Sequence, residues 1–170
     1  MRPGVRLGVD VGSVRVGLAV SDPEGRLASP AGTLTRQAHT GADLEQVVAR
    51  ARQHDALEVV VGLPRSLSGE EGMAATVARD YARSLQRSLG ETPVRLWDER
   101  LTTVDAHRQL RESGVASRRQ RDSVDQAAAV LILQAAMDAE RNTGAPGGEV
   151  VTRRKPRRRA ASHRQQGRQS

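Results

Sequence analysis

A change in hydrophobic period along the chain most constrains its fold. Apolar residues alternate with polar or small ones over residues 5–11, and the alternation resumes over residues 16–20 after a Gly-Ser turn at 12–13. A period of two is typical of β-strands, so this stretch predicts a tight hairpin. A third strand is expected over residues 26–33. The chain therefore opens with an antiparallel meander.

Beyond the meander, hydrophobic patterns typical of helices alternate with patterns typical of strands. Apolar residues at helical spacing predict an amphipathic helix over 44–51, and the run 57–64 is typical of a strand buried on both faces. The elements expected next are a helix over 70–89, a strand over 93–97, a helix that begins near Thr102 and a helix over 122–138. The order βββαβαβαα predicts a single α/β domain, a mixed sheet flanked by helices.

The composition changes near residue 140. We expect a folded domain over residues 1–140, and a Gly/Pro linker with an Arg-rich tail over 141–170. Residues 153–170 carry eight basic and no acidic side chains, so the first 152 residues have a net charge of −1 although the whole chain has +7. With no large apolar residue, the tail is expected to be disordered. It would serve as an electrostatic tether for phosphate backbones or as a solubilising segment.

The composition also excludes several classes of protein. The chain has no cysteine, which rules out disulfides, thiolate nucleophiles and Cys-ligated zinc or iron–sulfur sites. Its four histidines lack the spacing of metal ligands. No apolar run of membrane-spanning length and no secretory signal pattern is present, so we expect a cytoplasmic protein with no membrane partner.

Three carboxylates stand where predicted elements end. Asp10 lies near the end of the first strand, Glu99 just after the last one, and Asp125 in the first turn of the closing helix. If the first and last strands lie near each other in the sheet centre, these groups converge, and Mg²⁺ or Mn²⁺ is the cation that such oxygen ligands select. Asp10 shares a strand face with Gly8, which leaves space beside it, and an unpaired buried carboxylate is costly.

The other two carboxylates also have structural explanations. Asp122 stands three residues before Asp125, so that Asp122 would cap the helix while Asp125 lies near its positive end. Glu99 would form a surface ion pair with Arg100 or Arg95, which contributes little to stability.

Four motifs occur in order along the chain. They are GVDVGSVRVGLAVSD at 8–22, VVVGLPRSLSG at 59–69, WDERLTT at 97–103 and SVDQAAAVLIL at 123–133. Together they resemble the YqgF family, also called RuvX, small bacterial proteins related to the Holliday-junction resolvase RuvC. The resemblance covers residues 5–138. It implies an RNase H-like fold, a three-layer α/β structure built on a mixed sheet.

The resemblance also implies a set of site residues. Asp10, Glu99 and Asp125 would be the catalytic carboxylates and the ligands of two Mg²⁺ or Mn²⁺ ions, which act on the attacking water and the departing oxygen of a phosphodiester. Asp122 completes a D-x-x-D pair and would be either a fourth ligand or a helix cap.

Arginines around these acids are candidate nucleic-acid contacts. Arg15 follows the first motif's turn, Arg65 lies in the loop after the second motif's strand, and Arg100 belongs to the DER triplet. Further basic residues near the acids are Arg118, Arg119 and Arg121. These arginines would track a nucleic-acid backbone, or they would be ordinary solvated surface charge. With only one Trp and one Tyr in the chain, base stacking is not expected.

The function implied by the resemblance is a metal-dependent endonuclease that matures the 5′ end of 16S rRNA from its precursor, on a pre-ribosomal particle. A Holliday-junction resolvase acting on branched DNA is the first alternative, and it requires a homodimer with two active sites. A non-catalytic RNA-binding module for ribosome assembly is the second alternative.

Overall fold

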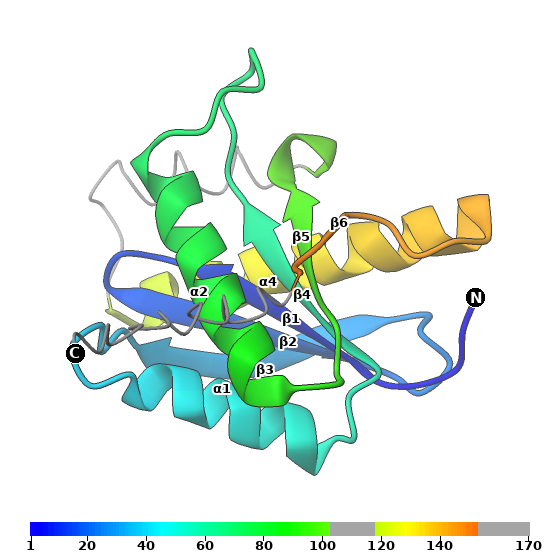
Figure 1. The fold of residues 1–170 in the computed structure, drawn as a ribbon, viewed down its shortest axis with the longest axis horizontal. Helices are drawn as coiled ribbons and strands as arrows, with labels where there is room; N and C mark the ends of the chain where they lie inside the picture. The colour runs from blue at the N-terminus through cyan, green and yellow to red at the C-terminus, as the bar shows by residue number, and fades with distance from the viewer. Residues whose placement is uncertain (103–117, 153–170) are drawn as a thin grey trace, which may run out of the picture.

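The computed structural model describes residues 1–102 and 118–152, with the backbone alone for 118–123. Its elements, in chain order, are β1 (Arg6–Val11), β2 (Arg15–Ser21), β3 (Ala28–Thr35), α1 (Ala42–Gln53), β4 (Glu58–Leu63), α2 (Met73–Leu89), β5 (Val94–Asp98), the 3₁₀ helix η1 (Glu99–Leu101), α4 (Arg118–Thr143) and β6 (Glu149–Val150) (Figure 1). No helix in these ranges is long and apolar enough to cross a membrane.

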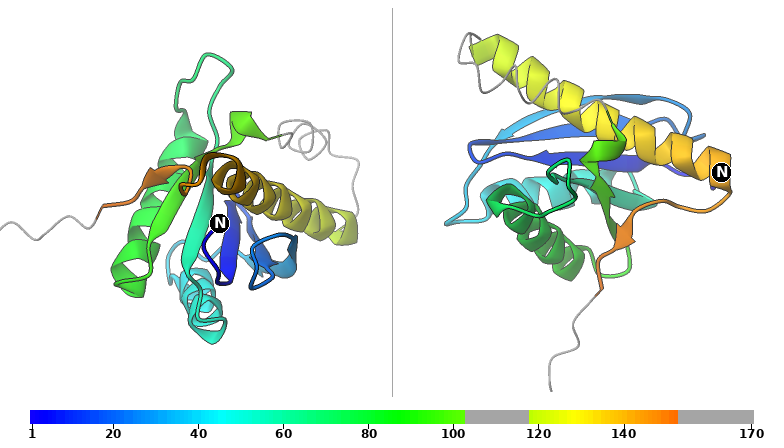
Figure 2. Two further views of the ribbon diagram at one scale, coloured as in Figure 1. Left: turned by 90° about the vertical axis from the view of Figure 1, so that its right-hand side faces the viewer. Right: turned by 90° about the horizontal axis from the view of Figure 1, so that it is seen from above.

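The strands form one mixed sheet in the order β3-β2-β1-β4-β5-β6. The first three strands are antiparallel neighbours, β1, β4 and β5 run parallel, and β6 is antiparallel to β5. Helices α1 and α2 cover one face and α4 covers the other (Figure 2). The predicted three-layer α/β class is therefore confirmed. The first and last predicted strands are not adjacent, because β4 lies between β1 and β5.

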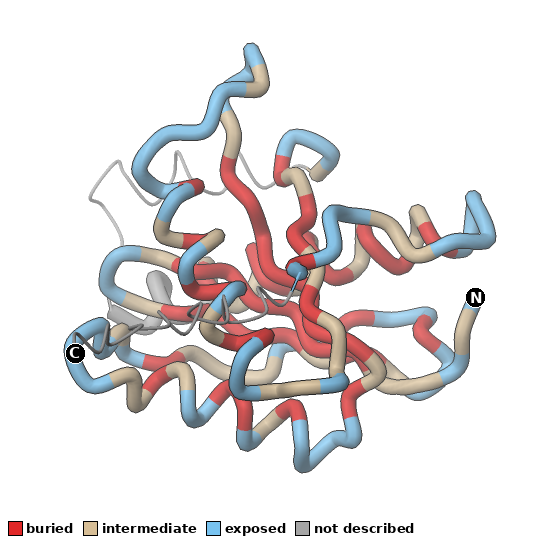
Figure 3. The backbone as a smooth tube through the Cα atoms, viewed as in Figure 1, coloured by how far each residue is buried: buried red, intermediate tan, exposed pale blue. Residues whose placement is uncertain are grey.

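Two apolar cores hold these layers together. Leu7 and Val9 of β1 point into the core under α1 and α2, whereas Ala19 of β2 and Val60 of β4 belong to the core under α4. Every residue of β1 and β4 is buried, as the continuous buried stretch in the middle of Figure 3 shows. A strand covered on both faces is mostly apolar on both, which explains the hydrophobic run after Glu58 in β4.

Some element bounds differ from the sequence prediction. β3 begins and ends two residues later than expected, and α4 is longer than 122–138 at both ends. β6 was not predicted, because a strand of two residues has no period to recognise. It lies past the boundary expected at residue 140, and Val151 after it is buried. The helix expected from near Thr102 falls on residues 103–117, and the Arg-rich tail on 153–170, both outside the described residues.

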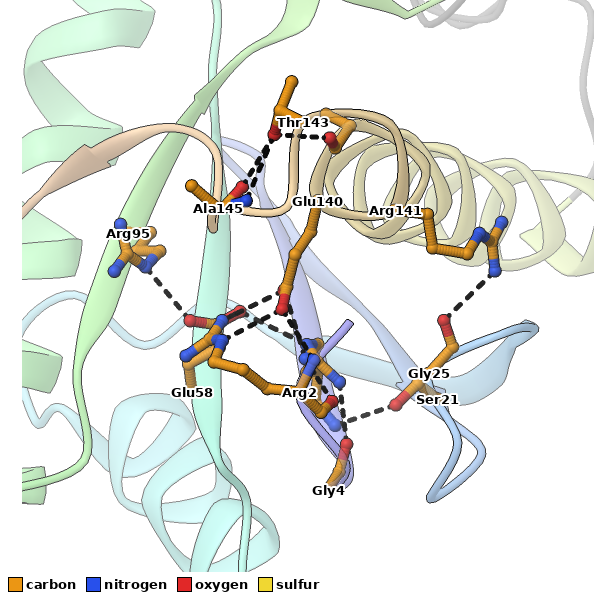
Figure 4. A network of polar contacts seen from close by, with 12 residues as sticks. Arg2, Gly4, Ser21, Gly25, Glu58, Arg95, Glu140, Arg141, Thr143 and Ala145 are labelled. Atoms are coloured by element: carbon orange, nitrogen blue, oxygen red, sulfur yellow. Dashed lines mark hydrogen bonds and ion pairs between the residues drawn. The ribbon is translucent and has the colours of Figure 1, made fainter.

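A buried ion-pair network joins the beginnings of the parallel strands to the last turns of α4 (Figure 4). Arg6, with only 1% of its surface exposed, donates to Glu58 of β4 and to Glu140 of α4 at 3.3 and 3.1 Å. Arg2 donates to the same two carboxylates, and Arg95 of β5 donates to Glu58 at 3.0 Å. Three arginines thus surround two buried carboxylates, so removing a carboxylate would leave the buried Arg6 without one of its two ion-pair partners.

Glu140 makes the stability of this network dependent on pH. Burial tends to raise the pKa of this carboxyl, but hydrogen bonds from Arg2 and the charges of Arg6 and Arg2 outweigh it, and the pKa falls from 4.5 to about 2. The stabilisation is therefore complete above pH 4.5 and is lost as the pH falls towards 2. We expect Glu140→Gln to lower the free energy of unfolding by about 3 kcal/mol at pH 7, and by progressively less as the pH falls through that window.

Urea unfolding of wild type and Glu140→Gln between pH 7 and pH 3 checks this expectation. The exposed Glu24→Gln is the control and should unfold with wild type throughout. A wild-type-to-Glu140→Gln difference that stays constant with pH would contradict the assignment.

Candidate functional site

Asp10 lies near the end of β1 on the face that α4 covers. It is 1% exposed and pairs with Gly17 of β2. Gly8, two residues earlier on the same face, is packed against α4, because a Cβ at Gly8 would stand 2.8 Å from the Cβ of Leu133. The space expected beside Asp10 at Gly8 is thus filled by the helix. Asp10 is therefore enclosed between β1 and α4.

Glu99 follows β5 directly and opens η1, and its side chain turns back over the sheet. It is 1% exposed, and a Cβ at Gly62 of β4 would stand 2.5 Å from its Oε1 atom. The parallel register that pairs Val9 with Val61 brings Gly62 alongside Asp10 at the next step. Gly62 therefore leaves the room in which the Glu99 carboxylate lies, one strand away from Asp10.

Asp125 reaches the same face from α4. It is 2% exposed, and its Oδ2 accepts a 2.7 Å bond from Nε of Arg15. Its backbone carbonyl lies over Gly17, where a Cβ would stand only 2.1 Å away. This close approach is possible only at glycine. The backbone of Asp125 therefore lies over Gly17, the residue of β2 that pairs with Asp10.

Asp10, Glu99 and Asp125 thus share the α4 face at one end of the sheet. Among the side chains that the structure describes, those of residues 1–102 and 124–152, no three His, Cys, Asp or Glu form a group that could hold a metal ion. The donor chemistry still fits a hard divalent cation, because every candidate ligand is a carboxylate oxygen. Each is also buried, and Asp125 already pairs with Arg15.

A family model described as RuvX, Holliday junction resolvase, matches residues 4–139. The chain belongs to the RuvX family. A relative from Kineococcus radiotolerans, named "Putative pre-16S rRNA nuclease", is 57% identical over 167 residues, which cover 98% of this chain and 88% of the relative. A relative of the same name from Frankia casuarinae is 56% identical over 143 residues, covering 84% and 71% of the two chains.

A solved structure supports the fold of this RuvX-family chain. RuvC of T. thermophilus, in complex with Holliday junction substrate, matches with a TM-score of 0.53 and 17% identity, covering 84% of this chain and 98% of that one. At this identity the likeness concerns the fold alone. It confirms the RNase H-like class expected from the motifs.

In this RuvX-family chain, two of the predicted arginines form an ion-pair cluster around Asp98, the residue before Glu99. Arg100 donates to both oxygens of Asp98, and Arg65 contacts Asp98 at 3.6 Å and Glu71 at 2.7 Å. Arg100 thus pairs with Asp98 of the DER triplet, and not with Glu99 as one structural explanation held. Loop 64–72 and η1 lie side by side here (Figure 1), since Gly69 packs against the Arg100 guanidinium.

Sequence reasoning missed the acidic partners of this cluster. Arg79 of α2 bridges Glu71 and Glu149, at 2.6 and 2.8 Å. The hydrogen bond from Arg79, with help from Arg65, lowers the pKa of Glu71 from 4.5 to about 2. No local pattern links these residues, because they come from a loop, a helix and the edge strand β6.

The remaining predicted site residues lie in α4 before the part whose side chains are described. They are Arg118, Arg119, Arg121 and Asp122. Their backbone is helical. Because α4 begins at Arg118, Asp122 lies inside the helix and does not cap its start, and Asp125 lies beyond the first turn, so both of those expectations are wrong. The role of Asp122 as a metal ligand stays a prediction.

Proposed function

We propose that this chain is a divalent-cation-dependent endonuclease that hydrolyses phosphodiester bonds in the precursor of 16S rRNA. One observation carries the proposal: three carboxylates from three separate elements, Asp10, Glu99 and Asp125, are each at most 2% exposed on one face of the sheet. Buried carboxylates that come from separate elements and gather on one face are typical of a functional site, and a site that binds cations accounts for this arrangement. The names of the relatives support the substrate.

Asp10, Glu99 and Asp125 would hold the cations, Mg²⁺ or Mn²⁺. When bound, two such ions supply Lewis-acid stabilisation for the attacking water and for the leaving 3′-oxygen. The carboxylates keep their positions because β1, η1 and α4 pack them in the interior. Arg65 and Arg100 both contact Asp98, the residue before Glu99. Their guanidinium groups suit backbone phosphates, and they would orient the strand.

The setting of this activity is part of the proposal. A precursor of 16S rRNA is assembled with protein in a pre-ribosomal particle, so the particle in the cytoplasm is the expected partner. Recognition would rest on backbone and shape, because the chain has only one Trp and one Tyr for stacking.

Junction resolution is the second candidate, favoured by the description of the matching family model. It needs cuts on two opposing strands, and hence a symmetric dimer that presents two sites. Sedimentation of the full chain, alone and with a four-way DNA junction, would reveal that dimer.

Cleavage by the purified full chain tests the proposal. The substrates are an RNA fragment that spans the 5′ end of 16S rRNA with its precursor extension, and a four-way DNA junction, each with Mg²⁺, Mn²⁺ or EDTA. We expect the RNA to be cut with either ion, and cutting to stop in EDTA and return with added ion. Symmetric cuts in the junction alone would favour the resolvase. Tight RNA binding without cleavage under any condition would leave only a non-catalytic role.

A further inference from the structure

Arg15 forms an ion pair with Asp125, one of the carboxylates assigned to the cation site. It is the first residue of β2, and its Nε lies 2.7 Å from Oδ2 of Asp125. The Asp125 side chain is 3% exposed and that of Arg15 is 22% exposed. One partner is thus buried in the site, while the other is still reached by solvent.

Arg15 is placed on the α4 face by the same geometry that places Asp125. It stands two residues before Gly17 in β2, so both point to that face. The Asp125 backbone sits against Gly17, and Gln126 donates to Thr33 of β3 at 3.3 Å. These contacts hold the N-terminal part of α4 against β2 and β3. The ion pair between Arg15 and Asp125 belongs to this packed contact between the helix and the sheet.

The guanidinium and a divalent cation compete for Asp125. A cation that used Oδ2 would stand within a few ångströms of a positive group, and like charges so close repel strongly in a partly buried site. The ion pair in its present form therefore opposes binding of a metal ion through Oδ2 of Asp125.

We propose that Arg15 is a positioning residue that exchanges partners, Asp125 in the protein alone and a backbone phosphate when nucleic acid is bound. The inference rests on the proposed function. A phosphate suits a guanidinium as well as a carboxylate does, and Arg15 follows the exposed tip of the β1–β2 hairpin at Ser13 and Val14. Departure of Arg15 frees Asp125 for the cation, so nucleic acid and cation promote each other's binding.

A purely structural ion pair predicts the opposite effect on the cation. If Arg15 only held Asp125 in place, its loss would disorder the carboxylate and weaken cation binding. In the exchange, its loss removes a competitor and strengthens cation binding, while it weakens nucleic-acid binding. Tighter cation binding together with weaker nucleic-acid binding after the loss of Arg15 therefore distinguishes the exchange from a purely structural ion pair.

The experiment compares wild type, Arg15→Gln, Arg15→Lys and the control Arg95→Gln. Arg95 is matched to Arg15, because it donates through Nε to a buried carboxylate, Glu58, at 3.0 Å with 15% of its side chain exposed. It belongs to the network at the other end of the strands (Figure 4). Mn²⁺ binding to each protein without nucleic acid is measured by electron paramagnetic resonance of the free ion.

Binding of a labelled precursor-rRNA fragment is measured in EDTA by fluorescence anisotropy at several salt concentrations. For Arg15→Gln we expect Mn²⁺ to bind about ten-fold more tightly, and RNA to bind more weakly with a salt slope reduced by about one. Arg15→Lys should stay near wild type in both measurements, and Arg95→Gln should leave the Mn²⁺ affinity unchanged.

Equal or weaker Mn²⁺ binding by Arg15→Gln, in a wild-type protein that binds Mn²⁺ and cleaves RNA, would overturn the exchange alone. A wild-type protein that neither binds Mn²⁺ nor cleaves would overturn the proposed function together with it. Tighter Mn²⁺ binding in Arg95→Gln as well would show a general charge effect, and would also overturn the exchange.

Discussion

Replacement of Asp10 by asparagine is expected to reduce cleavage by about 10³-fold or more while the protein stays folded. The change keeps the shape of a side chain that is 1% exposed, but removes the charge that would hold the cations. A loss of about 4 kcal/mol of transition-state stabilisation corresponds to this factor. Single-turnover cleavage of the precursor-rRNA fragment measures it, and thermal unfolding should show equal or higher stability because one of several neighbouring like charges is gone.

Asp80→Asn is the matched control for this experiment. Asp80 is on α2 with 66% of its side chain exposed, so its loss should leave cleavage at the wild-type rate. Asp10→Asn protein that cleaves as fast as wild type would exclude Asp10 from the reaction and point to another site or to a contaminating nuclease.

Gly17→Ala is expected to destabilise the protein by about 3 kcal/mol, near the upper end for an overpacked core, and to abolish cleavage as well. The added Cβ would stand 2.1 Å from the carbonyl oxygen of Asp125 and 2.5 Å from its carbonyl carbon. These atoms are backbone, so no change of rotamer relieves the clash. Helix α4 must retreat from β2 and take the Asp125 carboxylate with it. Urea unfolding and the cleavage assay measure the two effects.

Gly72→Ser separates this clash from the general cost of changing a glycine. Gly72 precedes α2 with extended backbone and no atom within 4 Å of an added Cβ, and serine is favoured at that position. Its stability and activity should match wild type. Wild-type stability in Gly17→Ala would mean that α4 does not rest on β2 as described.

Much of the fold could be predicted from local patterns. The period of two marked β1 and β2, the unbroken apolar run marked β4, and helical spacing marked α1 and α2 within a few residues of their bounds. These signals are local, because each reports which faces of one element are buried. β6 escaped because its two residues are held by pairing with β5, and nothing in its own sequence requires a strand.

The candidate site was predicted less completely. The three carboxylates were recognisable by their positions at element ends and by their motifs, and their catalytic roles stay predictions. The pairing of Arg15 with Asp125, of Arg100 with Asp98, and of Arg6 with Glu140 was not foreseen. From sequence alone, each of these arginines is indistinguishable from solvated surface charge.

By itself, the sequence determined the order of the elements from β1 to β5, the faces of the sheet that are apolar and the concentration of positive charge in residues 153–170. Only the tertiary structure decided which charges meet, because α4 lies across β1, β2 and β3 and brings Asp125 to Arg15 over a separation of 110 residues. The period of apolar residues is a local property, because it depends only on residues close together in the sequence. Charge pairing depends on how closely two elements approach, and here glycine at position 17 sets that distance.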